Sequence, residues 1–221
     1  MWLCPSVMRP HNIERLALVA HDVPLTIRLH QGDPMLAEYK KLDMPEKWKV
    51  AIGPDCACGG AWQWAFETFP DEKFYGFIGD DCVPQTEGWE EKLSEAAGDW
   101  AIAYPDDGMW GEKQCTHPCI GGDLVRAAGF WGMPTLEHNF IDGVWLSIGK
   151  ALGLLAYVDE VKFDHRHWRN EKAVEDVVYL IGDSLYEKDE AAYREYGKSG
   201  AFRSTIMRIS KARLEAGEAA V

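Results

Sequence analysis

Hydrophobic and polar positions follow two different periods along the first half of the chain. Short apolar runs rich in β-branched and aromatic residues predict strands, at residues 1–6, 24–30, 48–54, 74–78 and 100–105. Between them, apolar residues recur with a helical period and predict helices, at residues 11–20, 59–69 and 86–97. Strands that alternate with helices form a mostly parallel sheet covered on both faces. The pattern therefore predicts the α/β class.

The second half of the chain is less regular and more helical. Residues 138–153 place apolar side chains on one helical face and end in Gly153, which predicts an amphipathic helix. Strand-like sequence follows at residues 154–168, then a second apolar stripe at 172–186 and a final basic helix at 201–216. No internal repeat or low-complexity linker divides the chain, so we expect one domain.

Polar residues gather where the predicted strands end. In open α/β sheets, ligands bind outside the carboxyl ends of the strands. The residues found there are Pro5 and Ser6 after the first strand, Asp33 after the second, Asp55 after the third, and Asp80 and Asp81 after the fourth.

The adjacent acids Asp80 and Asp81 need a physical explanation, because two like charges repel and burial would raise the pKa of one of them. A divalent cation removes this repulsion, and hard oxygen ligands suit Mg²⁺ or Mn²⁺. The alternative is a solvated turn in which both side chains face water. The aromatic strand that precedes the pair favours the metal.

The composition limits the classes of protein that this chain can be. Its 221 residues are 47% hydrophobic, enough for one sizeable core. The net charge of −13 argues against a surface that binds nucleic acid throughout. No stretch approaches the roughly 20 apolar residues of a membrane span, and the N-terminus lacks the layout of a signal peptide. We therefore expect a cytoplasmic protein.

Six cysteines follow no spacing typical of secreted disulfide frameworks, and reduced thiols are expected. Two close pairs leave a second interpretation open. Cys56 with Cys58 and Cys115 with Cys119 could together supply four ligands to zinc.

Several segments resemble, in order, those of GT-A-fold glycosyltransferases, which are nucleotide-sugar-dependent enzymes, and are similar to small phage-encoded members. The resemblance covers residues 2–180. It rests on WLCPSVMRP (the opening strand and nucleotide loop), AWQWAFETFP (the helix before the metal strand), YGFIGDDCVPQTEGWEEKL (the DxD region), IGGDLVRAAGFW and HNFIDGVWLSIGKALG (the acceptor-side loop and helix), and FDHRHW with EDVVY (the His-x-His segment).

The resemblance implies a single Rossmann-like GT-A domain with a mostly parallel sheet and a C-terminal helical extension. Residues 1–105 would form the nucleotide-sugar-binding half and residues 106–197 the acceptor and catalytic half. Residues 198–221 would form the basic C-terminal helix. If the protein is phage-encoded, its location would be the host cytoplasm.

The activity implied is metal-dependent transfer of a sugar from a nucleotide-sugar, which we expect to be a UDP-sugar, with Mn²⁺ or Mg²⁺ as cofactor. Asp81, His165 and His167 match the metal ligands of the family. Cys82 stands where many relatives carry a third acid, so ligation would fall on Asp81, with Asp80 nearer the ribose or holding a ligating water.

The donor-binding residues implied combine the first strand, the other strand ends and two arginines whose guanidinium groups match phosphate geometry. Turn residues and surface ion pairs are the alternative roles of the same side chains. The set is Pro5, Ser6, Arg9, Asp33, Asp55, Asp80 and Arg166.

An acceptor hydroxyl loses its proton as it attacks, which calls for a carboxylate base. Asp142 matches the family's base position, with Glu137 in reserve, and a base at Asp142 implies inversion at the sugar. A first-turn or capping role in the helix is the alternative for Asp142. Gly121, Gly122 and Trp131 match acceptor-side positions. Trp110 and Trp168, like Trp131, could stack on a sugar or base, or pack in the core.

The acceptor implied by the phage relatives is a hydroxymethylated pyrimidine in DNA, with a polysaccharide as the other possibility. A basic segment without acids could contact a phosphate backbone, and its residues are Lys198, Arg203, Arg208, Lys211 and Arg213.

Two other classes remain open. A metal-dependent nucleotidyltransferase or phosphohydrolase also places acids after strands, although residues 4–12 contain neither the glycine nor the lysine of a nucleotidyltransferase phosphate loop. A non-enzymatic binding module stabilised by zinc would use the cysteine pairs. The oligomeric state is not predicted.

Overall fold

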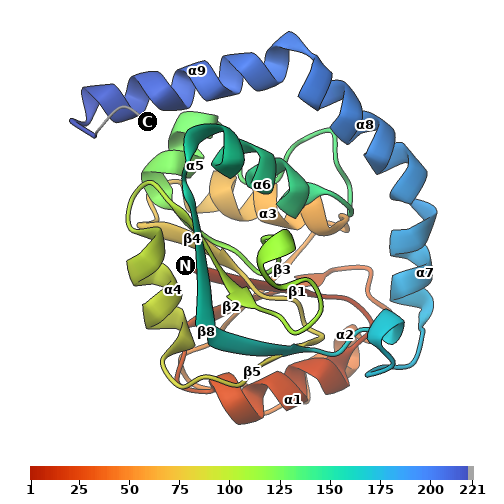
Figure 1. Cartoon of the computed structure of the whole chain (residues 1–221). Helices are drawn as coiled ribbons and strands as arrows, with labels where there is room; N and C mark the ends of the chain where they lie inside the picture. The colour runs from red at the N-terminus through yellow and green to blue at the C-terminus, as the bar shows by residue number, and fades with distance from the viewer. Residues whose placement is uncertain (219–221) are drawn as a thin grey trace.

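The computed structural model describes residues 1–218 and confirms the α/β class (Figure 1). Within these residues the strand order of the sheet is β3-β2-β1-β4-β7-β6-β8-β5. The strands are β1 (Trp2–Ser6), β2 (Leu25–His30), β3 (Lys49–Gly53), β4 (Phe74–Phe77), β5 (Cys82–Pro84), β6 (Ile102–Asp106), β7 (Cys119–Gly121) and β8 (Leu155–His165).

The helices flank this sheet on both faces. They are α1 (Pro10–Ala20), α2 (Leu36–Tyr39), α3 (Cys58–Thr68), α4 (Trp89–Ala97), α5 (Gly122–Ala128), α6 (Ile141–Leu152), α7 (Val177–Ser184), α8 (Tyr186–Lys198) and α9 (Gly200–Glu215), with short 3-10 turns at Gly111–Lys113 and Trp168–Asn170.

Most of the strand pairings are parallel, as predicted. β1 pairs in parallel with β2 and β4, β2 with β3, and β6 with β8. β7 runs antiparallel between β4 and β6, and β5 runs antiparallel to β8. The hydrophobic pattern missed β5 and β7 because each is only three residues long, too short to show a period.

Each face of the sheet has its own hydrophobic cluster. The helical face of α1 buries Ile13, Leu16 and Ala20 against one side of the sheet, together with residues of α2 and α4. The opposite side is covered by α3, α5 and α6, where Val144 and Trp145 of α6 are fully buried. Helix α6 ends at Gly153 in the left-handed conformation, as its sequence predicted.

The predicted C-terminal helical extension is present, and it forms an arc. In Figure 1, α7, α8 and α9 run around one side of the molecule and over α5 and α6, and contacts of α9 with both helices confirm this placement. Helix α8 was not predicted, because its sequence is largely polar and buries only Asp189 and Tyr196. Residues 219–221 of the predicted basic helix lie outside the described residues.

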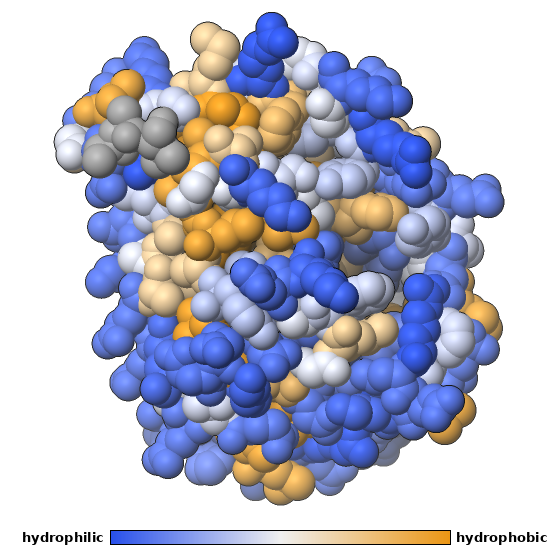
Figure 2. Space-filling view, viewed as in Figure 1, coloured by the Kyte–Doolittle hydropathy of each residue, from blue (hydrophilic) through white to orange (hydrophobic). Residues whose placement is uncertain are grey.

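In the view of Figure 2, apolar side chains gather beneath α9, whereas most of the lower half is hydrophilic apart from an apolar patch at its lower edge. Among residues 1–218, no helix is both long and apolar enough to cross a membrane.

Candidate active site

A cavity of about 470 Å³ opens at the carboxyl ends of β1 and β4, where the strand-end residues were expected to meet a ligand. The residues that line it are far apart in the chain and range from Pro5 to Leu185. The predicted site residues that line it are Pro5, Ser6, Arg9, Asp80, Asp81, Asp142, His165 and His167.

Asp80 is almost fully buried beside the first strand. The hydroxyl of Ser6 donates to its Oδ2 at 2.6 Å, and the guanidinium of Arg9 lies 3.3 Å from its Oδ1. Burial raises the pKa of Asp80 to about 6, although Arg9 acts in the opposite direction. The two contacts hold the Asp80 carboxylate in place, while its burial disfavours the ionised form.

Asp81 reaches the histidine segment through the register of β5 with β8. This antiparallel pair sets Cys82 opposite His165, and the backbone N–H of Arg166 donates to the Asp81 carbonyl at 2.8 Å. As a result, Asp81 Oδ1 lies 3.7 Å from His165 Nε2, while the Tyr179 hydroxyl donates to Asp81 Oδ2 at 2.9 Å. Burial alone would raise the pKa of Asp81, but His165 holds it well below its usual range.

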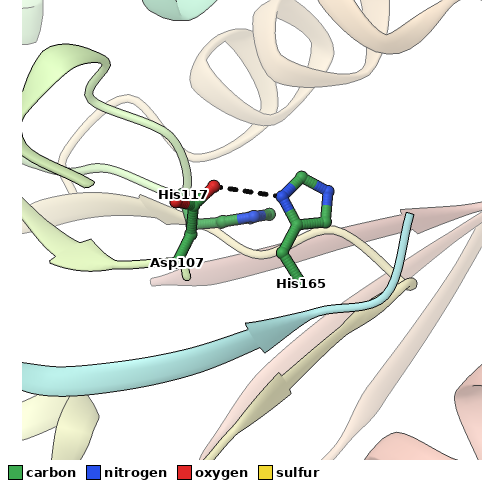
Figure 3. Close-up of side chains that lie close together, drawn as sticks. All are labelled: Asp107, His117 and His165. Carbon is green, nitrogen blue, oxygen red and sulfur yellow. Dashed lines mark hydrogen bonds and ion pairs between the residues drawn. The ribbon is translucent and has the colours of Figure 1, made fainter. Parts of the chain in front are cut away.

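His165 is oriented from its other ring nitrogen. Figure 3 shows Asp107 facing the imidazole, with Asp107 Oδ2 at 3.1 Å from His165 Nδ1. The second oxygen of Asp107 accepts hydrogen bonds from the backbone N–H groups of Met109, Trp110 and Gly111. Burial would lower the pKa of His165, but the two carboxylates raise it to about 9. The fully buried Asp107 therefore fixes the direction of the ring.

His117 completes this cluster, with its ring 4.9 Å from that of His165 (Figure 3). The backbone N–H of Gly79 donates to His117 Nδ1 at 3.2 Å, and the other nitrogen, Nε2, is buried without a hydrogen-bond partner in the described part of the chain. Burial, and then the charge of His165, lowers the pKa of His117 to about 4. Ligand atoms of Asp107, His117 and His165 all lie within 4.8 Å of one another.

This set of donors fits a divalent metal ion. Neutral imidazole and carboxylate are suitable ligands for Mn²⁺ and related ions, and an unsatisfied buried Nε2 on His117 is the kind of atom that an ion would satisfy. Asp81 and His165 can each supply one ligand atom. Asp81 Oδ1 and His165 Nε2 face each other at 3.7 Å, which is too long for a direct hydrogen bond. Asp107 then acts from behind His165, as in carboxylate–histidine–metal arrangements.

Asp107 and His117 were missed by sequence reasoning. Asp107 directly follows the end of β6 at Asp106, so it carries the same strand-end signal as Asp80 and Asp81. His117 was considered only as part of a cysteine-rich segment. Its left-handed backbone, with φ of 51°, and its burial beside Phe77 give no periodic signal.

His167 lies at the edge of the cluster. Its Nδ1 accepts a hydrogen bond from the Arg169 backbone N–H at 3.1 Å, so it caps a short 3-10 turn. Its ring lies 4.4 Å from that of Tyr179, and burial lowers its pKa to about 4. It faces the main cavity but is not among the three clustered ligands.

Asp142 lies in the first turn of α6 and lines the cavity. Its Oδ1 accepts from the backbone N–H of Gly143 at 2.8 Å, which is a local first-turn contact. Burial raises the pKa of Asp142. A carboxylate with a raised pKa in a cleft is suited to accept a proton.

Three residues predicted to bind the donor, Asp33, Asp55 and Arg166, do not line the main cavity. Asp33 is buried and accepts hydrogen bonds from the backbone of Met8 and Met35, which ties the loop after β1 to the loop after β2. Asp55 is exposed and accepts from the Gly32 N–H at 2.9 Å. Arg166 lines a separate cavity.

The predicted acceptor-side residues lie away from the cavity. Gly121 and Gly122 pack closely against the backbone of Asp99 and Glu72, where a side chain would have no room. Trp131 is fully buried, with its ring 5.0 Å from that of Trp62.

The last acceptor-side candidate, Glu137, and the two other tryptophans considered for stacking lie in different surroundings. Glu137 points away from the cavity and forms an ion pair with Lys188. Trp110, in contrast, lines the cavity and is 47% exposed, so it is the tryptophan placed to stack on a ligand. Trp168 lies beside His167, with Arg169 over its ring.

The cysteines form no metal-ligand cluster within residues 1–218. Cys115 and Cys119 are buried, and Cys56 and Cys58 are partly buried in the wall of the cavity. Nothing in this placement favours the zinc-stabilised module.

The fold and the site can now be compared with known structures. The mannosyltransferase PcManGT from Pyrobaculum calidifontis, solved with GDP-Man and Mn²⁺, has a TM-score of 0.52 and 9% identity, over 99% of this chain and 75% of that one. TarS residues 1–349 from S. aureus has a TM-score of 0.50 and 9% identity, over 96% of this chain and 82% of that one. No family model matches the sequence, and no curated protein matches it either.

At this level of identity the likeness concerns the fold. The chain has the GT-A-like α/β fold, as its motifs predicted, and it shares this fold with the mannosyltransferase PcManGT.

Proposed function

We propose that this protein is a metal-dependent glycosyltransferase that moves a sugar from a nucleotide-sugar to an acceptor hydroxyl. One observation carries the proposal: within a GT-A-like fold, Asp81 Oδ1 and His165 Nε2 face each other at 3.7 Å in the main cavity. The neighbour solved with GDP-Man and Mn²⁺ supports the same reading of the donor and the ion.

Asp81 and His165 would hold Mn²⁺ or Mg²⁺, and His117 and His167 are the nearest further imidazoles. Bound there, the ion would stabilise negative charge on the leaving phosphate as a Lewis acid. Since the pKa of His165 is about 9, a metal ion would have to displace the proton on Nε2, and Asp107 would keep the other proton on Nδ1.

The donor would lie along the loop after β1. Ser6 and Asp80 form a hydrogen-bonded pair at the position expected for the ribose, and the guanidinium of Arg9 lies next to it. Arg9 is neutralised by Asp80 and Asp176, and it lies 3.9 Å above the ring of Tyr179. These contacts hold the guanidinium group of Arg9 in a fixed position beside the expected diphosphate.

Asp142 would act as the general base. The acceptor oxygen attacks the anomeric carbon and transfers its proton to Asp142, while the bond to the diphosphate breaks and its electron pair leaves with the phosphate. A single displacement of this kind inverts the configuration at the sugar. Trp110 would pack against the sugar or acceptor at the cavity mouth.

The proposal is tested by calorimetric titration of UDP-glucose and GDP-mannose, with and without Mn²⁺. We expect saturable binding of one of them that requires Mn²⁺ and that weakens at least about tenfold in Asp81→Asn. Asp106→Asn is the matched control, since Asp106 is the last residue of β6 and pairs with Lys162 outside the cavity. Binding that ignores both Mn²⁺ and Asp81→Asn would refute the metal-dependent donor site.

For the acceptor, we propose a hydroxymethylated pyrimidine in DNA. The support is the basic segment at the C-terminal end, in which Lys198, Arg203 and Lys211 are exposed. Two of its arginines serve packing instead: Arg208 donates to the Ala128 carbonyl at 2.6 Å, and Arg213 is buried. Transfer of radiolabelled sugar to hydroxymethylated DNA, and not to unmodified DNA, is the expected result. Transfer to a polysaccharide alone would replace this acceptor.

A further inference from the structure

A second cavity, of about 320 Å³, lies between the first turn of α1 and the segment from Arg166 to Asp176. Arg9 and Tyr179 line both this cavity and the main one, so they form a shared wall. The other residues that surround the second cavity are mostly basic or polar, and they include His11, Asn12, Arg15, Arg166, Lys172 and Asp176.

The acid that lines this cavity is already neutralised. Both carboxylate oxygens of Asp176 accept hydrogen bonds from Arg9 at 2.7 Å. The charge of Lys172 is likewise directed elsewhere, since its ammonium donates to Asp164 at 2.7 Å. Two arginines that line the cavity are less completely paired.

Arg15 and Arg166 are these two arginines, and among residues 1–218 the Nε donor of each lacks an acceptor. Arg15 donates to the neutral side chain of Asn12 at 2.7 Å. Arg166 Nε lies 3.8 Å from Asp164, which is too long for a hydrogen bond. Within residues 1–218, the Nε atoms of both arginines are buried and have no hydrogen-bond partner. Buried donors of this kind are costly unless something accepts from them.

The two guanidinium groups also act on each other. Burial lowers the pKa of Arg15, and the charge of Arg166 lowers it further. Asp80 and Asp81 raise this pKa, but each has a smaller effect than Arg166. Arg15 and Arg166 are like charges that repel each other, as Asp80 and Asp81 do in the main cavity, but here the charges are positive. An anion between them would relieve the repulsion and supply the missing acceptors.

Helix α1 adds to the positive potential. It has eleven residues, begins at Pro10, and has no side chain that caps its N-terminus. Its first residues, His11 and Asn12, line the second cavity. The positive end of the helix dipole therefore acts in the same direction as the two arginines.

We propose that the second cavity binds a phosphate group between the guanidinium groups of Arg15 and Arg166, at the N-terminus of α1. The planar guanidinium fork matches phosphate oxygens. This assignment goes beyond the proposed glycosyl transfer, and it gives Arg166 a ligand separate from the donor diphosphate. The phosphate could be an ester group carried by the acceptor or free inorganic phosphate, and the shared wall of Arg9 and Tyr179 would place either one beside the donor.

The test is equilibrium titration of the full-length protein with inorganic phosphate and with methyl phosphate, in EDTA and at low ionic strength. Without a divalent ion, the acid pair in the main cavity repels phosphate, so binding there does not interfere. We expect one saturable site, and affinity about tenfold lower in Arg15→Gln and in Arg166→Gln. Arg194→Gln is the matched control, because Arg194 is an exposed helical arginine paired with Glu190.

The conservative variants Arg15→Lys and Arg166→Lys, with thermal unfolding as a check, separate loss of charge from loss of folding.

Binding of methyl phosphate would assign the site to a phosphate ester, and binding of inorganic phosphate alone would assign it to the free anion. Equal affinities in wild type, Arg15→Gln and Arg166→Gln would overturn the site. So would competition between phosphate and a Mn²⁺-dependent nucleotide-sugar, which would return Arg166 to the donor. A failure of donor binding alone would leave the phosphate result intact.

Discussion

His165 is held on both sides by carboxylates whose roles differ. Asp107 contacts Nδ1 and receives three backbone hydrogen bonds on its other oxygen, whereas Asp81 faces Nε2 across a gap. The three N–H donors prevent Asp107 from turning its second oxygen toward the ring. Asp107 is thus a positioning residue for the candidate metal ligand.

Asp107→Asn should weaken Mn²⁺ binding by about 10- to 100-fold. The backbone donors will keep the amide oxygen of Asn, so its NH₂ will face His165 Nδ1 and force the proton onto Nε2. Isothermal titration with Mn²⁺ measures the effect, and Asp106→Asn serves as control since Asp106 binds Lys162 outside the cavity. Unchanged Mn²⁺ affinity in a folded Asp107→Asn protein would contradict the role.

Asp142→Asn should lower the rate of sugar transfer by about 10²- to 10⁴-fold while donor affinity is retained. The amide preserves size and can still accept from the Gly143 N–H, but it cannot take a proton from the acceptor. Steady-state rates and donor titration on the same preparation separate the two effects. Normal turnover would remove Asp142 as base, and Glu137 could not replace it without leaving its ion pair with Lys188.

At the scale of elements, the C-terminal arc contributes to the main cavity through one buried acid. Asp189 of α8 accepts hydrogen bonds from the backbone N–H groups of Glu137, His138 and Asn139, at 2.7–3.0 Å. His138 and Asn139 line the cavity, so α8 fixes the loop that leads to Asp142. A largely polar helix therefore has a structural function that its hydrophobic pattern did not reveal.

Asp189→Ala should lower the free energy of unfolding on the order of 3 kcal/mol, because three N–H donors lose their acceptor. Burial would raise the pKa of Asp189, but the N–H donors outweigh it and hold the pKa below the ordinary value of 3.8. The stabilising contribution is therefore complete above pH 3.8 and is lost as the pH falls through the lower folded-state value. Urea unfolding of the variant at several pH values measures this difference.

The neighbouring Glu190→Gln is the control for Asp189→Ala, since Glu190 forms a surface pair with Arg194. Its effect should stay within about 0.5 kcal/mol. Equal unfolding free energies for the two variants would show that Asp189 does not hold the loop.

At the scale of the whole molecule, segments far apart in the chain converge on one acidic centre. Asp81 and Asp107 come from the connections that follow β4 and β6, His165 from the end of β8, and Tyr179 from α7. Two of the carboxylates are buried in a protein of net charge −13. The binding of a cation at this centre should therefore be coupled to the stability of the whole fold.

Mn²⁺ should raise the melting temperature, with a stabilisation of about 2.7 kcal/mol when the free ion is at 100 times its dissociation constant. EDTA should reverse the shift, and Asp81→Asn should abolish it. Differential scanning calorimetry at fixed pH and protein concentration is the measurement. An equal shift in Asp81→Asn would mean that the ion binds elsewhere.

Much of the architecture could be predicted from amino-acid order, because strands and amphipathic helices carry their period locally. Such patterns predicted the parallel strands and the helices α1, α3, α4, α6 and α9. The adjacent acids Asp80 and Asp81 indicated a metal site because their mutual repulsion has no local explanation in the sequence. β5, β7 and α8 were missed because two are too short and one is too polar to show a period.

The membership of the site was decided by tertiary structure. The β5–β8 register brings Asp81 to His165, and the loops after β6 and before β7 bring Asp107 and His117 to the same ring. The same folding buries Trp131 in the core and turns Glu137 toward Lys188. Local sequence encodes the propensity of each segment. The contacts of Asp107 with His165 and of Asp81 with Tyr179 join residues 58 and 98 positions apart, so they arise only when the sheet closes, and the ligand geometry depends on them.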